Sequence, residues 1–360
     1  MERRAILKLT GLAGIMAAGM APAVVKAQEN LRWRLASSFP KHLDTIYGGG
    51  EVFAQKVREL SDGKFNISVH AGGELMPAMG VVDALEQNSV EAAHTAPYYF
   101  FGKNEAFALS CAIPFGMNSR QLTAWMYHGN GLKLTRDFYA NYNIVNFPCG
   151  NSGVQMGGWF RKQINTPEDV RGLKIRIGGL PGKVIEKLGG IPQNIAGGEV
   201  YQALEKGVID AAEWVGPYDD LRLGFHKVAP YYYYPGWWEG SVGLDLLVNK
   251  KAYDGLSQHY KDIVAAASTY AHLDMQAKYD ARNPGALKEL VGQGAKVLPF
   301  SKEVLDASFK ASQELYAELN ESNPQWRTIY ADYRAFQKDE LLWFRFAEAR
   351  FDQYMQSVTL

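Results

Sequence analysis

The sequence predicts an α/β protein with two similar lobes, each built on a mostly parallel sheet. The first observation is a phrase that occurs twice: residues 84–94 read ALEQNSVEAAH and residues 203–213 read ALEKGVIDAAE. Both copies soon reach a Pro-Tyr pair, at 97–98 and 217–218. Each copy is typical of a helix end, a tight turn and a short buried strand, so the same unit used twice indicates two facing lobes. Chance is the alternative, because Ala, Leu and Glu are common helix formers.

The second observation is the alternation of strands and helices through residues 31–94. Strand segments alternate apolar and polar residues, and helical segments repeat apolar residues every three or four positions. This order is that of a mostly parallel sheet. The predicted elements are a strand at 31–37, a helix at 43–60, a strand at 65–69, and a helix at 79–86 that leads into the first copy of the phrase.

The third observation is that the same order returns after about residue 150. Thr166 reads as an N-cap, with Pro167 at the first helical position and acids in the first turn, so a helix is expected to begin there. The other predicted elements are a strand at 174–177, a helix at 181–188, and a helix at 199–206 that carries the second copy.

The chain is expected to cross between the lobes twice, near residues 150 and 238, and so to form a hinge. The aromatic run within 231–247 is the second crossing. The predicted domains are a first lobe of 31–152 plus about 238–285 and a second lobe of 153–237 plus about 286–325.

Residues 326–357 predict one long C-terminal helix. Large apolar residues recur there at steps of three or four or their multiples, and Pro324 stands at the start. Such a helix exceeds the usual globular length, so its apolar stripe is expected to pack either on the chain's own lobes or on a second subunit.

Residues 1–27 are typical of an export signal. Arginines at 3–4 precede an apolar stretch at 12–25 that is too short and too rich in glycine to span a bilayer. The start resembles a twin-arginine signal, with cleavage expected after Ala27, or alternatively after Ala23. The mature protein is therefore expected to be soluble and outside the cytoplasm, in the periplasm.

The composition excludes some classes of partner. The 360 residues hold 38 basic and 38 acidic side chains, so there is no electrostatic case for nucleic acid as a partner. Cys111 and Cys149 are the two cysteines, and they carry no CxxC spacing. They fit either a disulfide or two buried thiols equally well.

Motifs for catalysis are missing. The sequence holds no GxSxG, no HExxH and no glycine-rich phosphate loop between a strand and a helix. His94 stands at a strand end, but a lone histidine there is more often structural. No catalytic residue is therefore assigned, and a binding protein is expected rather than an enzyme.

Four residues suit binding instead. Arg176 follows a predicted strand, where its planar fork can hold a carboxylate; a surface salt bridge is the alternative. Glu213 and Glu239 lie in apolar and aromatic surroundings, and with the amide oxygen of Gln155 they offer hard oxygen ligands for Na⁺ or Ca²⁺. The alternative for each acid is a hydrogen-bonded structural carboxylate.

These residues stand in motifs that resemble the extracytoplasmic solute-binding subunits of tripartite ATP-independent periplasmic (TRAP) transporters. The resemblance covers essentially the whole mature chain and implies the two-lobed periplasmic-binding-protein fold, with membrane permease subunits as partners. In that family the arginine of the Lys-Ile-Arg segment clamps the substrate carboxylate, which here is Arg176. The motifs are TPEDVRGLKIR at 166–176, EVYQAL at 199–204, GVIDAAE at 207–213 and GGEL at 72–75.

Within the family the chain resembles the branch that binds 2-oxo- or 2-hydroxymonocarboxylates with a metal ion. Gln155 stands where many dicarboxylate and sialic-acid binders have a basic residue, and Glu213-Trp214 replaces the more usual Glu-Asn. The resemblance implies that Gln155, Glu213, the Trp214 carbonyl and Glu239 hold the cation, which bridges to the substrate carboxylate and its 2-oxo oxygen. It also implies a homodimer in which the C-terminal helix is exchanged.

The main expectation is therefore a periplasmic receptor for a small, pyruvate-like 2-oxoacid. Arg176, Gln155 and Trp214 are the expected substrate contacts, and first-lobe aromatics, Phe39, Tyr98 and Tyr99, are the expected walls of the cleft. The alternatives are a 2-hydroxyacid such as lactate, a dicarboxylate or a larger organic acid as ligand. A different alternative is a secreted enzyme acting on small acids, with Glu213 as general base.

Overall fold

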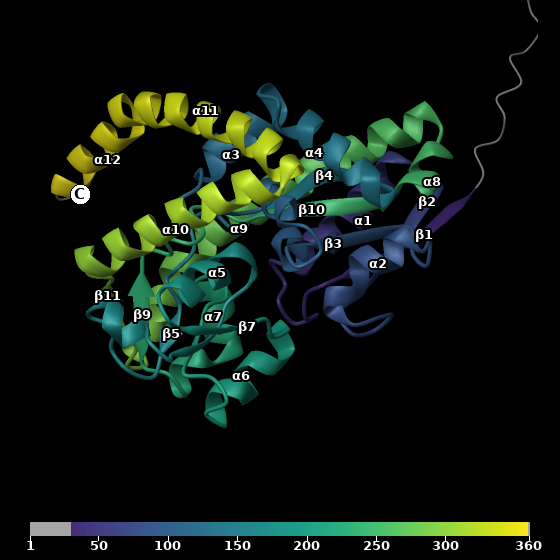
Figure 1. Cartoon of the computed structure of the whole chain (residues 1–360). Coiled ribbons are helices and arrows are strands. Elements are labelled where there is room, and N and C mark those ends of the chain that lie inside the picture. The colour runs from purple at the N-terminus through teal and green to yellow at the C-terminus, as the bar shows by residue number, and fades with distance from the viewer. Residues whose placement is uncertain (1–29, 359–360) are drawn as a thin grey trace, which may run out of the picture.

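The strands form two sheets that lie in separate lobes, shown in Figure 1. The structure is a computed structural model and describes residues 30–358, so the predicted export signal and its cleavage at Ala27 or Ala23 lie outside the described residues. The first sheet has the order β2-β1-β3-β10-β4, and the second has the order β11-β9-β5-β8-β6-β7. The strands are β1 Leu31–Ser37, β2 Phe65–His70, β3 Ala92–Thr95, β4 Ile144–Asn151, β5 Trp159–Phe160, β6 Lys174–Arg176, β7 Ile191–Gln193, β8 Ala211–Ala212, β9 Tyr231–Tyr234, β10 Gly243–Asn249 and β11 Lys296–Pro299.

Each sheet is parallel apart from one strand. In the first lobe β10 runs antiparallel to β3 and β4, and in the second lobe β5 runs antiparallel to β8 and β9. Both are the first strand that the chain forms after it crosses from the other lobe. The expected two-lobed α/β fold with mostly parallel sheets is confirmed.

The two copies of the repeated phrase occupy equivalent places. In the first lobe α2 (Val81–Glu86) leads into β3, which lies between β1 and β10. In the second lobe α6 (Gly197–Glu205) leads into β8, which lies between β6 and β5. The phrase is therefore a shared unit of scaffold. His94, inside β3, and Glu213, directly after β8, each follow the paired alanines of the phrase.

The helices cover the faces of the sheets and also join the lobes. The 35-residue helix α9 packs on α1 and β4 in the first lobe and on α7 in the second, which makes a third connection between the lobes. The remaining helices are α1 Gly48–Leu60, α3 Ser119–His128, α4 Gly131–Tyr139, α5 Gly179–Lys187, α7 Pro217–Leu223, α8 Lys250–Asp254, α9 Gln258–Gly292, α10 Lys302–Ser322, α11 Pro324–Phe346 and α12 Glu348–Ser357.

Two predicted helices within the lobes differ from the structure. Helix α1 begins at Gly48 rather than residue 43, and a Cβ at Gly49 would lie 2.2 Å from the Met275 methyl of α9, so glycine is needed for this close packing. The helix expected at Thr166 is wrong in length. Thr166 forms the capping box, but only one 3₁₀ turn follows, Pro167–Val170, because extended Arg171 and left-handed Gly172 (φ 71°) lead straight into β6.

The two crossing segments, 152–158 and 235–242, run side by side and bond to each other. The amide of Gln155 donates to the carbonyl of Glu239 at 3.2 Å, and the amide of Gly236 donates to the carbonyl of Gln155 at 2.9 Å. The crossings lie near the expected positions, 150 and 238. Gln155 and Glu239 therefore stand on the segments that join the lobes.

The C-terminal region forms two helices instead of one. The first half of α11 is buried on the first lobe, where the Tyr333 hydroxyl accepts from the Met117 amide at 2.7 Å. The expected long C-terminal helix is confirmed as α11, but it ends at Phe346 instead of residue 357. The backbone bends at Ala347, and Arg120 of α3 pairs with Glu348 beyond the bend. The end of α11 and all of α12 project from the body of the molecule (Figure 1). Their large exposed side chains are Leu341, Leu342, Trp343, Phe346, Phe351 and Tyr354.

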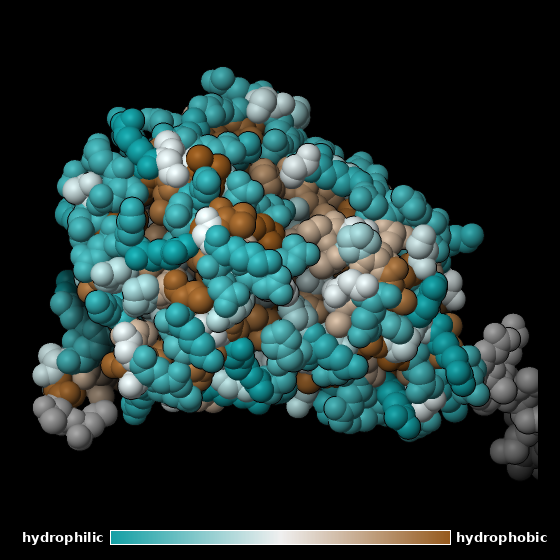
Figure 2. Space-filling view, turned by 90° about the horizontal axis from the view of Figure 1, so that it is seen from below, coloured by the Kyte–Doolittle hydropathy of each residue, from teal (hydrophilic) through white to brown (hydrophobic). Residues whose placement is uncertain are grey.

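The surface is mainly hydrophilic on the side seen in Figure 2, where hydrophobic residues form small patches. Within residues 30–358, no helix is both long enough and apolar enough to cross a membrane. Cys111 and Cys149 are buried free thiols, so the disulfide alternative does not hold.

Candidate functional site

The site lies at the carboxyl ends of two adjacent parallel strands of the second lobe. Arg176 is the last residue of β6 and pairs in register with Ala212 of β8, so Glu213 follows directly beside it. The amide of Glu213 donates to the carbonyl of Arg176 at 3.0 Å. Ligands of open α/β sheets bind at such strand ends.

Arg176 is fully buried and has one free donor. Its Nη1 donates to the Glu213 carbonyl at 2.5 Å and to Glu213 Oε2 at 3.1 Å, and its Nε donates to the Ile195 carbonyl at 3.2 Å. The guanidinium lies over the Trp214 ring at 4.7 Å. Nη2 is buried without a hydrogen-bond partner. Because buried donors are almost always paired, Nη2 points to an acceptor supplied by a ligand.

Four oxygen atoms converge beside this arginine. The side-chain oxygen of Gln155 lies 2.5 Å from Glu239 Oε2, 2.7 Å from Glu213 Oε1 and 2.7 Å from the Trp214 carbonyl oxygen. The Gln155 amide nitrogen faces away and donates to Ser152 Oγ at 3.1 Å. Oxygens at this spacing with no hydrogen between them repel one another unless a cation lies among them, so the residues fit a hard cation.

The donor set is characteristic of such a cation. It has two carboxylates, one amide oxygen and one backbone carbonyl, which suit Na⁺ or Ca²⁺ rather than a soft metal. Among residues 30–358, no three His, Cys, Asp or Glu side chains gather as a metal site would. The two acids alone would not reveal this site, because half of its oxygens come from neutral groups.

Burial makes both carboxylates hard to ionise. Removal from water raises the pKa of Glu239 to about 7, although the charge on Arg176 lowers it. The pKa of Glu213 is raised well above its usual value, first by burial and then by the charge of Glu239, against the opposing effect of Arg176. Glu239 Oε1 has no hydrogen-bond partner. One buried arginine offsets two buried acids only in part, which again favours a bound cation.

Two tyrosines of the first lobe close over the site. A Cβ at Gly178 would lie 2.6 Å from the Tyr98 ring, and one at Gly179 would lie 2.9 Å from its Cβ, so these glycines let Tyr98 contact the second lobe. Tyr99 packs edge-on against Tyr98, with ring centroids 5.0 Å apart. Burial raises the pKa of Tyr99 to about 12, although the Arg176 charge lowers it. Both phenols therefore stay neutral.

Phe39 lies one layer behind this wall. Its ring contacts Tyr99 at 6.4 Å and His94 at 5.7 Å between centroids. His94 is fully buried and its Nε2 lies 3.1 Å from the Cys149 carbonyl. Burial lowers the pKa of His94 to about 4, so the ring is neutral and structural. Among these expected wall residues, Tyr98 and Tyr99 contact the second lobe, whereas Phe39 supports Tyr99.

Some residues of the site were not indicated by the sequence. Ser152 holds the Gln155 amide, and the Ile195 carbonyl holds Arg176 Nε. Gly197 lies against the Trp214 ring, where a Cβ would be 2.1 Å from the nearest ring carbon. Gly178 and Gly179 leave room for the Tyr98 ring, and Gly197 leaves room for the Trp214 ring.

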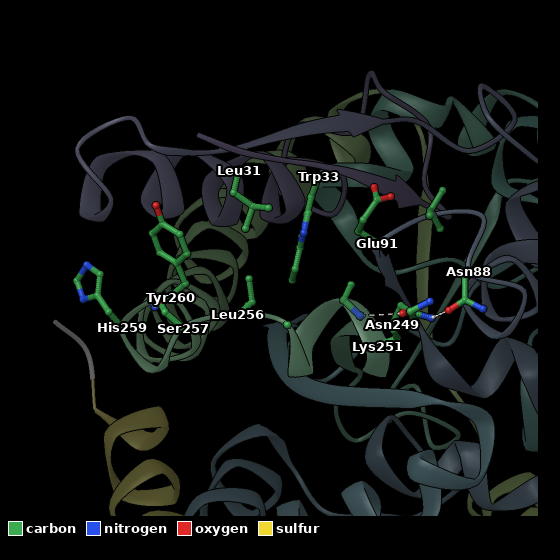
Figure 3. Close-up of a pocket in the computed structure, with 13 residues that line it drawn as sticks. Leu31, Trp33, Asn88, Glu91, Asn249, Lys251, Leu256, Ser257, His259 and Tyr260 are labelled. Atoms are coloured by element: carbon green, nitrogen blue, oxygen red, sulfur yellow. Dashed lines mark hydrogen bonds between the residues drawn. The ribbon is translucent and has the colours of Figure 1, made fainter. Parts of the chain in front are cut away.

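A groove of about 1070 Å³ lies elsewhere, on the first lobe (Figure 3). It is lined by the start of β1, with Leu31 and Trp33, and by the chain before and at the start of α9, with Leu256 and Tyr260. The residues of the site do not line this groove, neither Arg176 nor the residues that supply the four converging oxygens. It is at the amino end of β1, whereas the site faces the carboxyl ends of the strands.

Comparison with known proteins supports the same family. The model of the bacterial extracellular solute-binding proteins, family 7, matches residues 36–323. A monocarboxylate 2-oxoacid-binding periplasmic protein of Nostoc sp. (strain PCC 7120) is 44% identical over 328 residues, which cover 91% of this chain and 90% of that protein.

Two solved structures are similar over nearly their whole length. A TRAP transporter solute-binding protein from Bordetella bronchiseptica, a mixed-occupancy dimer with copurified calcium and picolinate, is 50% identical with a TM-score of 0.90, covering 91% of this chain and 98% of that chain. A TRAP periplasmic solute-binding protein from Pseudoalteromonas atlantica with bound sodium and pyruvate is 39% identical with a TM-score of 0.88, covering 92% and 100%. The chain therefore belongs to family 7 of the bacterial extracellular solute-binding proteins, the solute-binding subunits of TRAP transporters.

Proposed function

We propose that this protein captures a small 2-oxo monocarboxylate such as pyruvate, together with Na⁺ or Ca²⁺, and delivers it to the membrane subunits of a TRAP transporter. The observation that carries the proposal is the pairing of four converging oxygens with a free buried guanidinium nitrogen, Arg176 Nη2. A cation and a carboxylate satisfy both at once. Relatives that bind 2-oxoacids, or pyruvate with sodium, share this fold at high identity.

The roles follow from the contacts. Gln155, Glu213, the Trp214 carbonyl and Glu239 would hold the cation, which when bound offsets the acidic charges and offers coordination to ligand oxygens. Arg176 Nη2 would donate to the ligand carboxylate. Its Nε and Nη1 keep donating to protein acceptors, which fix the orientation of the guanidinium group. Gln155 and Trp214 would thus contribute to both cation and substrate binding.

The surroundings favour a small acid. Tyr98 lies against Gly178 and Gly179, and Trp214 lies against Gly197, so aromatic rings occupy the space around Arg176. Arg176 is also the one basic residue among the site residues described here, whereas a dicarboxylate would need a second. A 2-hydroxyacid such as lactate offers the same carboxylate and a 2-oxygen, and it is the second candidate ligand.

A ligand panel tests this assignment. Thermal unfolding would be measured for the calcium-loaded protein with pyruvate, lactate, succinate and a bulky aromatic acid at equal concentration. Because a ligand that binds only the folded state stabilises it, pyruvate is expected to raise the Tm most. A larger shift with succinate would contradict the proposal for a monocarboxylate.

We also propose that the protein does no chemistry on the acid. Glu213 is the residue that could act as a general base. Its Oε2 lies 3.1 Å from Arg176 Nη1 and its Oε1 faces the Gln155 oxygen, so both oxygens are directed at other residues of the binding site. Candidate acids incubated with the purified protein are expected to give unchanged proton NMR spectra. Catalytic product accumulation would favour the enzyme alternative.

The exposed end of α11 and helix α12 support a proposed homodimer. Phe346, Phe351 and Tyr354 are each more than 60% exposed on a segment that projects from the body, and a second copy could cover them. Phe346→Glu together with Phe351→Glu is expected to turn a dimer into a monomer in sedimentation experiments. A wild-type monomer at all concentrations would refute the dimer.

Export through residues 1–27 to the periplasm is likewise proposed.

A further inference from the structure

Ser152 is a buried residue beside the oxygen group for which neither the motifs nor the relatives suggest a role. It lies at the start of the first crossing segment and is 4% exposed. Its Oγ donates to the Gly153 carbonyl at 2.9 Å and lies 3.1 Å from Gln155 Nε2. Ser152 therefore stands between a carbonyl and a residue of the proposed cation site.

The bond from the Ser152 hydroxyl to the Gly153 carbonyl favours one orientation of the Gln155 amide. A serine hydroxyl has one proton to donate, and a carbonyl can only accept. While that proton stays on the Gly153 carbonyl, the Ser152 oxygen accepts from Gln155. In the opposite amide orientation the hydroxyl would have to leave Gly153 and donate to the Gln155 oxygen at 3.1 Å. The Gln155 atom that faces Ser152 is then the amide nitrogen, which leaves the amide oxygen facing Glu213 and Glu239.

The opposite orientation would have a different chemistry. It would place the Gln155 nitrogen 2.5 Å from Glu239 Oε2 and 2.7 Å from Glu213 Oε1, where it would donate to both carboxylates and to the Trp214 carbonyl. The acids would then be satisfied by N–H groups, and the position of an oxygen ligand would be taken by hydrogens. The amide orientation thus separates a cation site from a closed hydrogen-bond network.

We propose that Ser152 is a positioning residue that keeps the Gln155 oxygen turned toward the cation site. This inference rests on the proposed function, because it assumes that a cation binds there. The local backbone holds Ser152 in place. The Ser152 amide donates to the Val242 carbonyl at 3.1 Å, and Gly153 has a φ of 68°, a conformation that glycine adopts without strain.

Calorimetric titration of Ca²⁺ into metal-free protein tests the role. Ser152→Ala is expected to weaken calcium binding about tenfold, the lower end of what outer ligand partners contribute. Ser152→Thr keeps a hydroxyl and is expected to restore it. Ser241→Ala, which removes another buried serine hydroxyl bonded to the Met117 carbonyl at 3.2 Å, is the matched control and is expected to bind as wild type. Wild-type calcium affinity in Ser152→Ala would overturn the proposal.

A second measurement does not depend on the variants. Wild-type protein labelled with ¹⁵N-glutamine, with Ca²⁺ added, is expected to show the Gln155 side-chain amide protons close to Ser152 by NMR. Amide protons that contact Glu213 or Glu239 instead would refute the orientation, even if the variants do not fold. If the wild type bound neither Ca²⁺ nor Na⁺ while the amide lay as described, the proposed function would fail and the orientation would stand.

A separate cluster of side chains joins the lobes at the surface. Asp44 of the first lobe accepts from the Tyr218 hydroxyl at 3.0 Å, from Arg282 Nη1 at 3.2 Å and from Arg222 Nη1. Both guanidinium groups lie 4.9 Å from the centre of the Tyr218 ring, one from α7 and one from α9. Arg282 also donates to the buried Thr45 at 2.9 Å.

We infer that Asp44 holds the lobes in the closed arrangement. Tyr218 and Arg222 lie on α7 of the second lobe, so opening of the cleft would separate Asp44 from both donors. An arrangement that only the closed state forms slows opening and therefore slows ligand release, without contacting the ligand. This too rests on the proposed function.

Stopped-flow measurement of pyruvate release tests the inference. Asp44→Ala is expected to speed release about fivefold, the upper end for an exposed ion pair, and to leave the association rate nearly unchanged. The control is Asp83→Ala, which removes an exposed ion pair to Lys103 within the first lobe and is expected to have no effect. Raised salt is expected to speed release from wild type but not from Asp44→Ala. Identical release rates in wild type and Asp44→Ala would overturn the inference that Asp44 holds the lobes closed. If wild type did not bind pyruvate at all, the proposed function would be refuted instead.

Discussion

At the scale of single residues, the site depends on where individual atoms find partners. Arg176 donates to protein acceptors through Nε and Nη1 and keeps Nη2 free. The protein itself therefore fixes the orientation of the guanidinium group toward a ligand. Preorganised donors of this kind lose little freedom when the ligand arrives. The arginine, Glu213 and Glu239 could be predicted from strand ends and apolar surroundings. Ser152 could not, because its role depends on one proton and on the fold of the next residue.

Arg176→Lys tests the arginine at this scale. Lysine keeps a positive charge near Glu213, but it cannot bond two acceptors and a ligand from one planar group. We expect pyruvate binding to weaken by about 100-fold, as for the loss of a charged hydrogen bond, with little change in Tm. Calorimetry and thermal unfolding would measure the two effects. Unchanged affinity would remove Arg176 from the site.

Arg176→Ala is expected to lower stability as well as binding. The substitution leaves Glu213 buried without its ion-pair partner, and both side chains are fully buried. Breaking a buried pair in this way costs about 3–5 kcal/mol. Urea unfolding of the metal-free variant would measure the loss. Wild-type stability would show that Glu213 is already neutral there.

At the scale of elements, the equivalence of β3 and β8 places different side chains at matching points. Glu213 faces the site, whereas His94 is a neutral residue of the core. The repeated phrase predicted the shared scaffold, but it could not predict this difference in role. The helix at Thr166 and the C-terminal helix were both predicted too long, for a related reason. Local capping and periodicity start a helix, but Gly172 and the bend at Ala347 end it.

Helix α7 offers a test through pH. Asp219 on α7 accepts from Tyr279 of α9 at 2.7 Å, and burial raises its pKa from 3.8 to about 7. Between these values the folded state holds a proton that the unfolded state has lost. This residue therefore makes stability fall as pH rises from 4 to 7, by up to about 1.4 kcal/mol per pH unit.

Asp219→Asn is expected to remove that contribution. Its free energy of unfolding should fall less steeply between pH 4 and 7 than that of wild type, and it should exceed wild type at pH 7.5. Denaturant unfolding at several pH values would measure both curves. Parallel curves would show that Asp219 does not titrate in this range.

At the scale of the whole molecule, two lobes and three connections bring the site together. The second lobe supplies Arg176, Glu213 and Trp214, the crossing segments supply Gln155 and Glu239, and the first lobe supplies Tyr98. The two-lobed architecture was predictable from the alternation of elements and the family resemblance. That one continuous helix, α9, joins both lobes was not, because this depends on which faces of a long helix meet which lobe.

In the proposed function, acid and cation bind to the protein as one unit. Calorimetric titration of pyruvate into exhaustively chelated protein, in sodium-free buffer with and without added Ca²⁺, tests this claim most directly. The structure predicts strong binding with Ca²⁺ and little or none without it, because the four converging oxygens would repel the oxygens of the acid unless a cation lies between them. Pyruvate binding of equal strength in the absence of any cation would contradict the account.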